Sequence, residues 1–360
     1  MKDSLHNLLK RSAILGFSCL LAAPLAVASC LNDVRLTGVN LAGAEFHTNK
    51  LPGNPEKDYA YPKESELSYI AAQGANVVRL PFRWERIQHQ ILSPLDTDEV
   101  KRLQKTIKSA NEKGLCVIID VHNYAKYYSQ PLQDDAALQD AFVDLWLRLA
   151  AVFTDANSTA FDLMNEPNYM SNGQWATLAK RTLAELRQAH AKNLVFIGGG
   201  HWSGLHDWFS ERDGVSNASV FADIKDPLKR AIVEVHQYAD QNHSGTGSDC
   251  RSADQFNDLF DKLSSWANEN GQQLFLGEFG MAPSVDCLLT LERFLTLMNG
   301  PAWKGWSYWA AGSWWGGYPL AINTNAETPS PQWQLLKKYF ERNLDNKSQP
   351  RPPIPKNHKR

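Results

Sequence analysis

Apolar segments with the character of β-strands alternate with amphipathic segments along most of the chain. The strand-like segments are mostly continuous apolar runs rather than strict alternations, which is typical of parallel strands covered on both faces. There are eight of these segments, and they span residues 34–40, 75–82, 115–122, 159–166, 193–199, 231–238, 273–280 and 303–310.

Between these segments, apolar residues recur at helical spacing. After the second segment, for example, Val100, Leu103 and Ile107 share one stripe, and Gly114 marks the end of the helix. Only the segment after the fifth strand, HWSGLHDWF, is limited to a short helix. Eight strand–helix units predict an α/β fold, a single-domain (β/α)8 TIM barrel. A doubly wound open sheet is the alternative, and it is disfavoured because no G-x-G-x-x-G follows the first strand.

The beginning of the chain has a different character. Lys2, Lys10 and Arg11 precede an apolar stretch that closes with small residues, and this order predicts a signal peptide over residues 1–29. The apolar part contains a proline and is shorter than the roughly 20 residues that a membrane span needs. The motif V-A-S-C, which ends at Cys30, also resembles a bacterial lipobox, so Cys30 is a candidate for lipidation and transient membrane anchoring. Both interpretations predict export.

The barrel domain is therefore predicted over residues 30–344, followed by a disordered, Pro-rich and basic tail over 345–360. With 360 residues, 43% hydrophobic content and twelve tryptophans, the chain can build a large core. The formal net charge is -2 and no Lys/Arg run occurs, which excludes nucleic acid as an expected partner. We expect no cofactor, no metal, since no CxxC or His-rich spacing occurs, and a monomer.

Because disulfides form in exported proteins, the remaining cysteines are candidates for pairing. Cys116 lies in the apolar run LCVIID and is expected to be a buried small side chain without a partner. Cys250 and Cys287 lie outside apolar runs and flank one strand-like segment, so we predict a disulfide between them.

Polar side chains stand where the predicted strands end. In a (β/α)8 barrel, the carboxyl ends of the strands and the loops that follow them build the functional site. Each such residue, taken alone, is more often structural than functional, but their coincidence at one end of one barrel favours a site. These residues are Asn40, Arg79, His122, Asn165, Glu166, His236, Tyr238, Glu278 and Trp309.

Two of these residues, Glu166 and Glu278, belong to the fourth and seventh strands and could face each other across the barrel mouth. A pair of carboxyl groups cleaves glycosidic bonds when one donates a proton and the other is ionised. Arg79 near Glu278 would hold that carboxylate charged, and Asn165 could bind the 2-hydroxyl of the sugar. The residues themselves leave open which glutamate has which role.

Seven motifs occur in the order GVNLAG, VVRLPFRWE, DVHNYAKY, MNEPN, VHQYADQNHSGTGSDC, GEFG and WSYWAAGSWWGG. Together they resemble glycoside hydrolase family 5, the retaining cellulases and related β-glycanases, over about residues 38–320. The resemblance implies that Glu166 is the acid/base and Glu278 the nucleophile. It also implies supporting roles for Arg79, His122, Asn165, His236, Tyr238 and Trp309.

The resemblance implies that aromatic side chains bind sugar, because the C–H faces of pyranose rings stack on flat aromatic surfaces. Trp309 would form the floor of the subsite before the cleaved bond. Weaker candidates for contact with substrate are Trp84, Trp202, Trp314, Trp315, Asn123, His47 and His201.

The expected function is a secreted, retaining endo-β-1,4-glucanase that acts on cellulose and related β-glucans. A mannanase, xyloglucanase or mixed-linkage glucanase is the alternative within the same scaffold, because each would keep the two glutamates. A non-catalytic carbohydrate-binding protein is disfavoured because both glutamates are present in intact motifs. A serine hydrolase is disfavoured because no G-x-S-x-G occurs.

Overall fold

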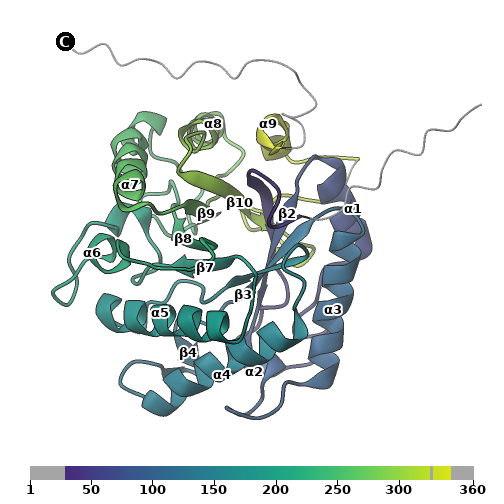
Figure 1. Cartoon of the computed structure of the whole chain (residues 1–360). Coiled ribbons are helices and arrows are strands. Elements are labelled where there is room, and N and C mark those ends of the chain that lie inside the picture. Colours follow the sequence, from purple (N-terminus) through teal and green to yellow (C-terminus); the bar gives the residue numbers. More distant parts are fainter. Residues whose placement is uncertain (1–28, 325–326, 342–360) are drawn as a thin grey trace, which may run out of the picture.

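The computed structural model describes residues 29–324 and 327–341, and eight parallel strands there close into a barrel in the order β1-β10-β9-β8-β7-β6-β3-β2 (Figure 1). The predicted (β/α)8 fold is confirmed. The barrel strands are β1 (Leu36–Leu41), β2 (Val77–Phe82), β3 (Cys116–Val121), β6 (Thr159–Asp162), β7 (Val195–Gly198), β8 (Ala231–His236), β9 (Leu274–Glu278) and β10 (Trp303–Ala311).

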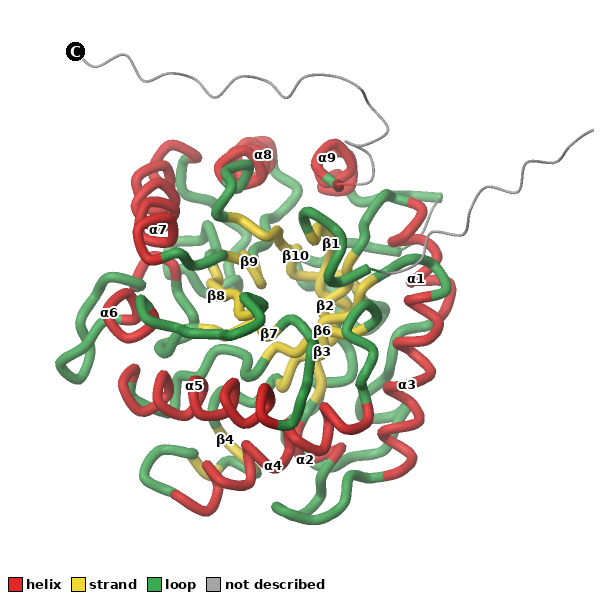
Figure 2. The backbone as a smooth tube through the Cα atoms, in the orientation of Figure 1, coloured by secondary structure: helices red, strands yellow, loops and turns green. Residues whose placement is uncertain are grey.

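Helices surround the central strands on all sides (Figure 2). They are α1 (Glu64–Ala72), α2 (Trp84–Ile87), α3 (Thr97–Asn111), α4 (Ala136–Val152), α5 (Asn172–Gln188), α6 (Asn217–Phe221), α7 (Asn257–Asn270), α8 (Val285–Leu297) and α9 (Pro331–Tyr339). Two 3-10 turns, Leu205–Asp207 and Ala253–Phe256, and a hairpin of β4 (Lys126–Tyr127) with β5 (Gln130–Pro131) lie in the loops. The segment after the fifth barrel strand contains only short helices, as its sequence predicts.

Several helices begin at residues whose side chains cap the free backbone N–H groups of the first turn. Asp96 accepts from Asp98 N and Glu99 N at the start of α3, and Ser284 accepts from Cys287 N at the start of α8. Ser171 caps α5 in the same way, by accepting from Gln174 N. This last cap fixes the end of the short loop that carries Glu166 out of the barrel.

The barrel interior changes from apolar to charged along its axis. Alternate residues of each strand point inward. At the amino ends of the strands, the inward residues form an apolar cluster that includes Leu36, Val77, Ile118, Phe196 and Phe275. Two residues further along their strands, Arg79, Asp120, Asp162 and Glu234 are fully buried. The apolar layer therefore supports a layer of buried charge that lies directly beneath the carboxyl ends of the strands.

Two disulfides tie the domain together, and one of them corrects the sequence analysis. Cys250 is joined to Cys287, the pairing expected from the sequence. Cys30 is joined to Cys116 over a Cα–Cα distance of 5.1 Å, so Cys116 is not an unpaired small side chain. Cys30 is also not a site of lipidation, for which it was a candidate, since its sulfur forms the disulfide and cannot carry a lipid. Both sulfurs belong to the apolar cluster at the amino end of the barrel.

We expect the double variant Cys30→Ala/Cys116→Ala to lose stability. The disulfide closes a loop with a sequence separation of 86 residues, and a loop of this length constrains the unfolded chain by up to about 4.6 kcal/mol. Urea unfolding of wild type and variant measures the difference. Peptide mapping without reductant provides the direct check, and a free thiol at Cys116 would contradict the pairing.

The predicted signal segment lies outside the described residues up to residue 28, as does the predicted tail over 345–360. Within the described part of the chain, none of the helices is both long and apolar enough to cross a membrane.

Candidate active site

Glu166 and Glu278 meet at the carboxyl end of the barrel, with the ring of His236 beside both. One oxygen of each carboxyl group and one His236 ring nitrogen all lie within 4.8 Å of one another. Carboxyl pairs separated by roughly 5 to 5.5 Å leave no room for an interposed water, so one of them must attack the sugar directly. The geometry therefore matches a retaining pair of carboxyl groups.

Glu278, the last residue of β9, is held at both oxygens. Its Oε1 accepts from Arg79 Nη1 at 2.9 Å, and its Oε2 accepts from the Tyr238 hydroxyl at 2.7 Å. Burial and the neighbouring Glu278 charge raise the pKa of the Tyr238 hydroxyl well above its usual value, so this hydroxyl stays protonated and donates. Both contacts fix the orientation of the carboxylate at the carboxyl end of the barrel.

The Arg79 guanidinium organises the floor of the site, and its N–H groups donate four hydrogen bonds and approach two further carboxyl groups. Besides Glu278, they reach side-chain oxygens from four other strand ends, which places one buried cation among several carboxylates. The hydrogen-bond acceptors are Asn40 Oδ1 (3.0 Å), Asn165 Oδ1 (2.9 Å) and Asp162 Oδ2 (2.8 Å), and the ion-pair contacts are Asp120 Oδ2 (3.1 Å) and Glu234 Oε1 (3.3 Å).

Glu166 follows β6 and has a φ of 44°, so the backbone turns sharply before Pro167. Its Oε1 lies 2.8 Å from His236 Nδ1. Burial raises the pKa of Glu166 and so does the charge of Glu278, while the hydrogen bond from His236 acts in the opposite direction. The net shift is upward, which keeps a proton on Glu166 to a higher pH than on an exposed glutamate.

His122 and Asn165 form a relay of hydrogen bonds on the other side of Arg79. His122 Nδ1 lies 2.7 Å from Asp120 Oδ2, and Asn165 Nδ2 lies 3.1 Å from His122 Nε2. These partners assign the proton of His122 to Nδ1, where it donates to Asp120, and leave Nε2 as an acceptor. One N–H of the Asn165 amide is thus used, and the second is available for a sugar hydroxyl.

Aromatic rings line the site on two sides. Trp309 is 8% exposed and stacks on His122 with ring centroids 5.5 Å apart. Trp315 meets Trp309 edge-on, and Trp314 lies next to His47. On the side of Glu166, Trp202 is 40% exposed and its edge contacts the rings of Tyr124 and Tyr169.

Two of the weaker predictions are corrected by the structure. Trp84 is fully buried and donates from Nε1 to Gln88 Oε1, so it belongs to the core behind β2 and does not line a subsite. Asn123 is also fully buried and holds the backbone of Trp84 and the carboxylate of Glu85. Both residues follow a strand end in the sequence, but their side chains turn away from the barrel mouth.

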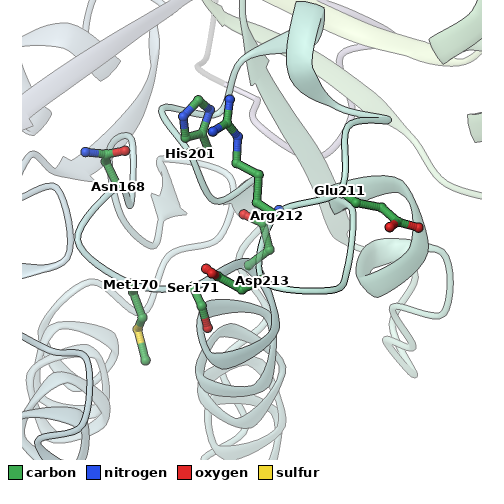
Figure 3. A pocket seen from close by; sticks show the side chains of 8 residues that line it. Asn168, Met170, Ser171, His201, Glu211, Arg212 and Asp213 are labelled. Carbon is green, nitrogen blue, oxygen red and sulfur yellow. The ribbon is translucent and has the colours of Figure 1, made fainter.

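A polar hollow of about 370 Å³ adjoins the loop after Glu166 (Figure 3). It lies between the loops that follow β6 and β7 and includes Asn168, Ser171 and Arg212. His201 and Arg212 lie side by side at one end of this hollow, where both contact Asp207. His201 therefore lines a depression next to Glu166 rather than the centre of the site.

The buried acids beneath the site were not predicted from the sequence. Asp120 and Glu234 each precede a strand-end histidine by two residues, so the alternation of side chains places each acid on the same face as its histidine. An acidic residue inside an apolar run, two positions before a polar strand end, is the signal that could have identified them. Asp162 and Glu45 are two further buried acids in this region.

Glu45 is expected to cost stability at alkaline pH. Burial raises the pKa of Glu45 to about 7, and one of its oxygens, Oε1, has no hydrogen-bond partner. Because the pKa is higher in the folded state than in the unfolded state, stability is lost as pH rises from the usual 4.5 through about 7. Glu45→Gln should therefore stabilise the fold by about 3 kcal/mol above pH 7. Urea unfolding at pH 4 and pH 8 checks this, and an equal effect at both values would contradict it.

A closed (β/α)8 barrel that brings two glutamates together at the carboxyl ends of its strands, with a buried arginine behind one of them, defines a glycoside hydrolase. Residues 33–312 match the family model described as cellulase, glycosyl hydrolase family 5. The chain belongs to this family, and the resemblance recognised in its motifs is confirmed.

Similar proteins from fungi and bacteria have related names. The chain is 30% identical over 288 residues to endo-beta-1,4-glucanase B of Aspergillus niger, covering 79% of this chain and 84% of that protein. It is 29% identical over 307 residues to endoglucanase gh5-1 of Neurospora crassa, covering 84% and 76%. A solved structure of an endo-beta-1,4-glucanase from Xanthomonas axonopodis pv. citri is 38% identical, with a TM-score of 0.83 and 86% of this chain covered, against 99% of that chain. The structure of XacCel5A in complex with cellopentaose is 40% identical, with a TM-score of 0.82 and coverages of 85% and 99%.

Proposed function

We propose that this glycoside hydrolase is an endo-β-1,4-glucanase that cleaves internal bonds of cellulose and related β-glucans with retention of configuration. The observation that carries the proposal is the separation of Glu166 and Glu278, whose nearest oxygens lie within 4.8 Å. The names of the similar fungal and bacterial proteins support the choice of substrate.

In the first step, Glu278 attacks the anomeric carbon while Glu166 donates its proton to the departing glycosidic oxygen. The raised pKa of Glu166 favours the protonated form that this step needs. Arg79 and Tyr238 hold the attacking carboxylate, so little reorientation is required when the sugar arrives. The products are a covalent glycosyl-enzyme and the shortened glucan chain that leaves.

In the second step, Glu166 removes a proton from water, which attacks the anomeric carbon and releases Glu278. The negative charge of Glu278 is lost when the ester forms, and this charge is one cause of the raised pKa of Glu166. The pKa of Glu166 therefore falls in the intermediate, as the change of role from acid to base requires.

Substrate contacts follow from the groups that remain free around the two glutamates. Trp309 supplies an aromatic face for the sugar before the cleaved bond, and the second amide N–H of Asn165 can donate to its 2-hydroxyl. Trp202 lies on the side of Glu166 and would contact the sugar that leaves. Trp314 and Trp315, with His47 next to Trp314, would extend the binding surface beyond Trp309.

Release of reducing sugar from carboxymethylcellulose, mannan, xyloglucan and mixed-linkage glucan, assayed side by side, tests the proposed specificity. We expect the highest kcat/KM on carboxymethylcellulose and a rapid loss of viscosity, because internal bonds are cut. A clear preference for mannan or xyloglucan would reject the proposed substrate while keeping the reaction type. Proton NMR of the first product formed tests retention, and an initial α-anomer would reject the mechanism.

We further propose that the protein is exported through its basic and apolar leader. The two disulfides support this location, since such bonds form and persist in oxidising compartments. Cell fractionation with peptide analysis of the mature amino terminus tests the proposal, and full-length chain retained in the cytoplasm would reject it.

A further inference from the structure

Glu234 is a fully buried carboxyl group beneath the two catalytic candidates, and the proposed mechanism does not use it. It precedes His236 by two residues on β8, so both side chains point into the barrel. Its Oε1 lies 3.3 Å from His236 Nε2 and 3.3 Å from Arg79 Nε. One oxygen of Glu234 thus contacts both Arg79 and His236. Arg79 holds Glu278, and His236 holds Glu166.

The neighbouring strands leave space for this carboxyl group. A Cβ atom added to Gly277 of β9 would lie 1.7 Å from Glu234 Oε1, closer than any contact allows. A Cβ atom added to Gly198 of β7 would lie 3.2 Å from Glu234 Oε2 and 2.6 Å from Ser203 Oγ. The strands on both sides of β8 therefore carry glycine where a side chain would displace Glu234.

The His236 ring is placed between carboxyl groups at both of its nitrogens. Its Nδ1 lies 2.8 Å from Glu166 Oε1 and 3.5 Å from Glu278 Oε2, while its Nε2 faces Glu234. A neutral imidazole has one N–H group, so it can donate on only one side. Donation on both sides requires the doubly protonated, positively charged ring.

The surrounding charges favour this charged form of His236. Burial lowers the pKa of His236, but the charges of Glu278 and Glu234 and the hydrogen bonds to Glu166 and Glu234 outweigh burial and raise it well above 6.5. The groups that face Glu234 are Arg79, His236 and Asp162, whose carboxyl interacts with both Glu234 and Arg79.

We propose that Glu234 is a positioning residue that keeps His236 doubly protonated and thereby sets how firmly Glu166 holds its proton. This inference deepens the proposed function and rests on the role given there to Glu166. The charged ring at 2.8 Å stabilises the ionised form of Glu166, which the second step of the reaction needs. A neutral ring would leave Glu166 protonated to a higher pH and make it a poorer acceptor of the proton from water.

The variant Glu234→Gln removes the charge with little change of shape. The glutamine amide can donate to Nε2, which favours a neutral ring with its proton on Nδ1, and we expect the pKa of His236 to fall because the Glu234 charge that raises it is gone. Removing the negative charge of Glu234 by itself lowers the pKa of Glu166, but Glu234 acts from the far side of the His236 ring. The loss of the positive charge on His236, which is closer, raises the pKa of Glu166 by more. The basic limb of the kcat/KM profile should therefore move up by about one pH unit.

Nitrogen-15 NMR of histidine-labelled protein at pH 7 is the decisive experiment, with His236 assigned by its absence in His236→Asn. We expect two protonated ring nitrogens in the wild type and one in Glu234→Gln. Glu234→Asp keeps the charge, so its ring should stay doubly protonated. Asp162→Asn is the matched control, because it alters a buried carboxyl group that contacts Arg79 and does not contact His236, so the His236 ring should also stay doubly protonated.

A doubly protonated His236 in Glu234→Gln, or an unshifted basic limb in that variant, would overturn the proposal. If Glu234→Gln does not fold, the ring spectra of the wild type and of Glu234→Asp provide the test. A singly protonated His236 ring in either protein would refute the proposal. The ring spectra do not depend on turnover. If the protein has no glucanase activity, the proposed function is rejected. The protonation state of His236 can still be measured in that case.

Discussion

Glu278→Gln should lower kcat on a soluble β-1,4-glucan by about 10⁴-fold or more, while binding of the glucan changes only a few-fold. The amide has the shape of the carboxylate and can still accept from Arg79 at the position of Oε1. It lacks the negative charge and the nucleophilic oxygen that form the glycosyl-enzyme. The loss is therefore expected in the chemical step and not in substrate binding.

Steady-state assays on carboxymethylcellulose and calorimetric titration with cellopentaose measure the two effects separately. Glu269→Gln is the matched control, because Glu269 is an exposed residue at the end of α7 and lies before the amino end of β9, whereas Glu278 stands at the carboxyl end of that strand. This control should retain wild-type kcat. If Glu278→Gln keeps more than a few per cent of the wild-type rate, Glu278 is not the nucleophile.

Glu166→Ala should reduce turnover by about 10²- to 10⁴-fold on unactivated glucans, because both the acid and the base are removed. On an aryl cellobioside with a good leaving group, the first step needs no protonation, so the glycosyl-enzyme accumulates. Azide is a small anion that fits the space left by the side chain and attacks without a general base. We expect it to restore the rate and to produce a β-glycosyl azide.

The same treatment of Glu278→Ala provides the control for the order of roles. With the nucleophile removed, azide would attack from the Glu278 side and produce the α-glycosyl azide. NMR of the purified azides distinguishes the two products. If Glu166→Ala produced the α-azide, the two glutamates would have to exchange roles.

The sequence predicted the barrel and the strand-end residues because both leave a periodic signal. Parallel strands covered on both faces read as apolar runs, and a polar residue at the end of such a run, such as Glu278 after QLFLG, interrupts it visibly. The closure of the barrel then follows from the number of strands. Their carboxyl ends meet at one face, so Glu166 and Glu278 could be expected near each other without coordinates.

The direction of individual side chains could not be predicted in the same way. Trp84 and Trp309 both lie near strand ends and have the same chemistry, but only Trp309 stacks on His122 beside the two glutamates, because Trp84 begins α2 and turns into the core. The partner of Cys116 was not predicted because Cys30 was interpreted as a candidate for lipidation directly after a leader over residues 1–29, and was therefore not considered for a disulfide. Glu234 was missed because an acid within an apolar run was counted as part of the strand.

The covalent link between Cys30 and the first residue of β3 has a practical consequence. Cys116 stands at the amino end of its strand, whereas Glu166 and Glu278 stand at the carboxyl ends, so the described chain starts at the end of the barrel opposite the two glutamates. An affinity handle or a solid support joined just ahead of Ser29 would therefore attach the enzyme through the amino end of its barrel. Immobilised in this orientation, the enzyme would turn the carboxyl end of the barrel, with Glu166 and Glu278, toward an insoluble cellulose surface.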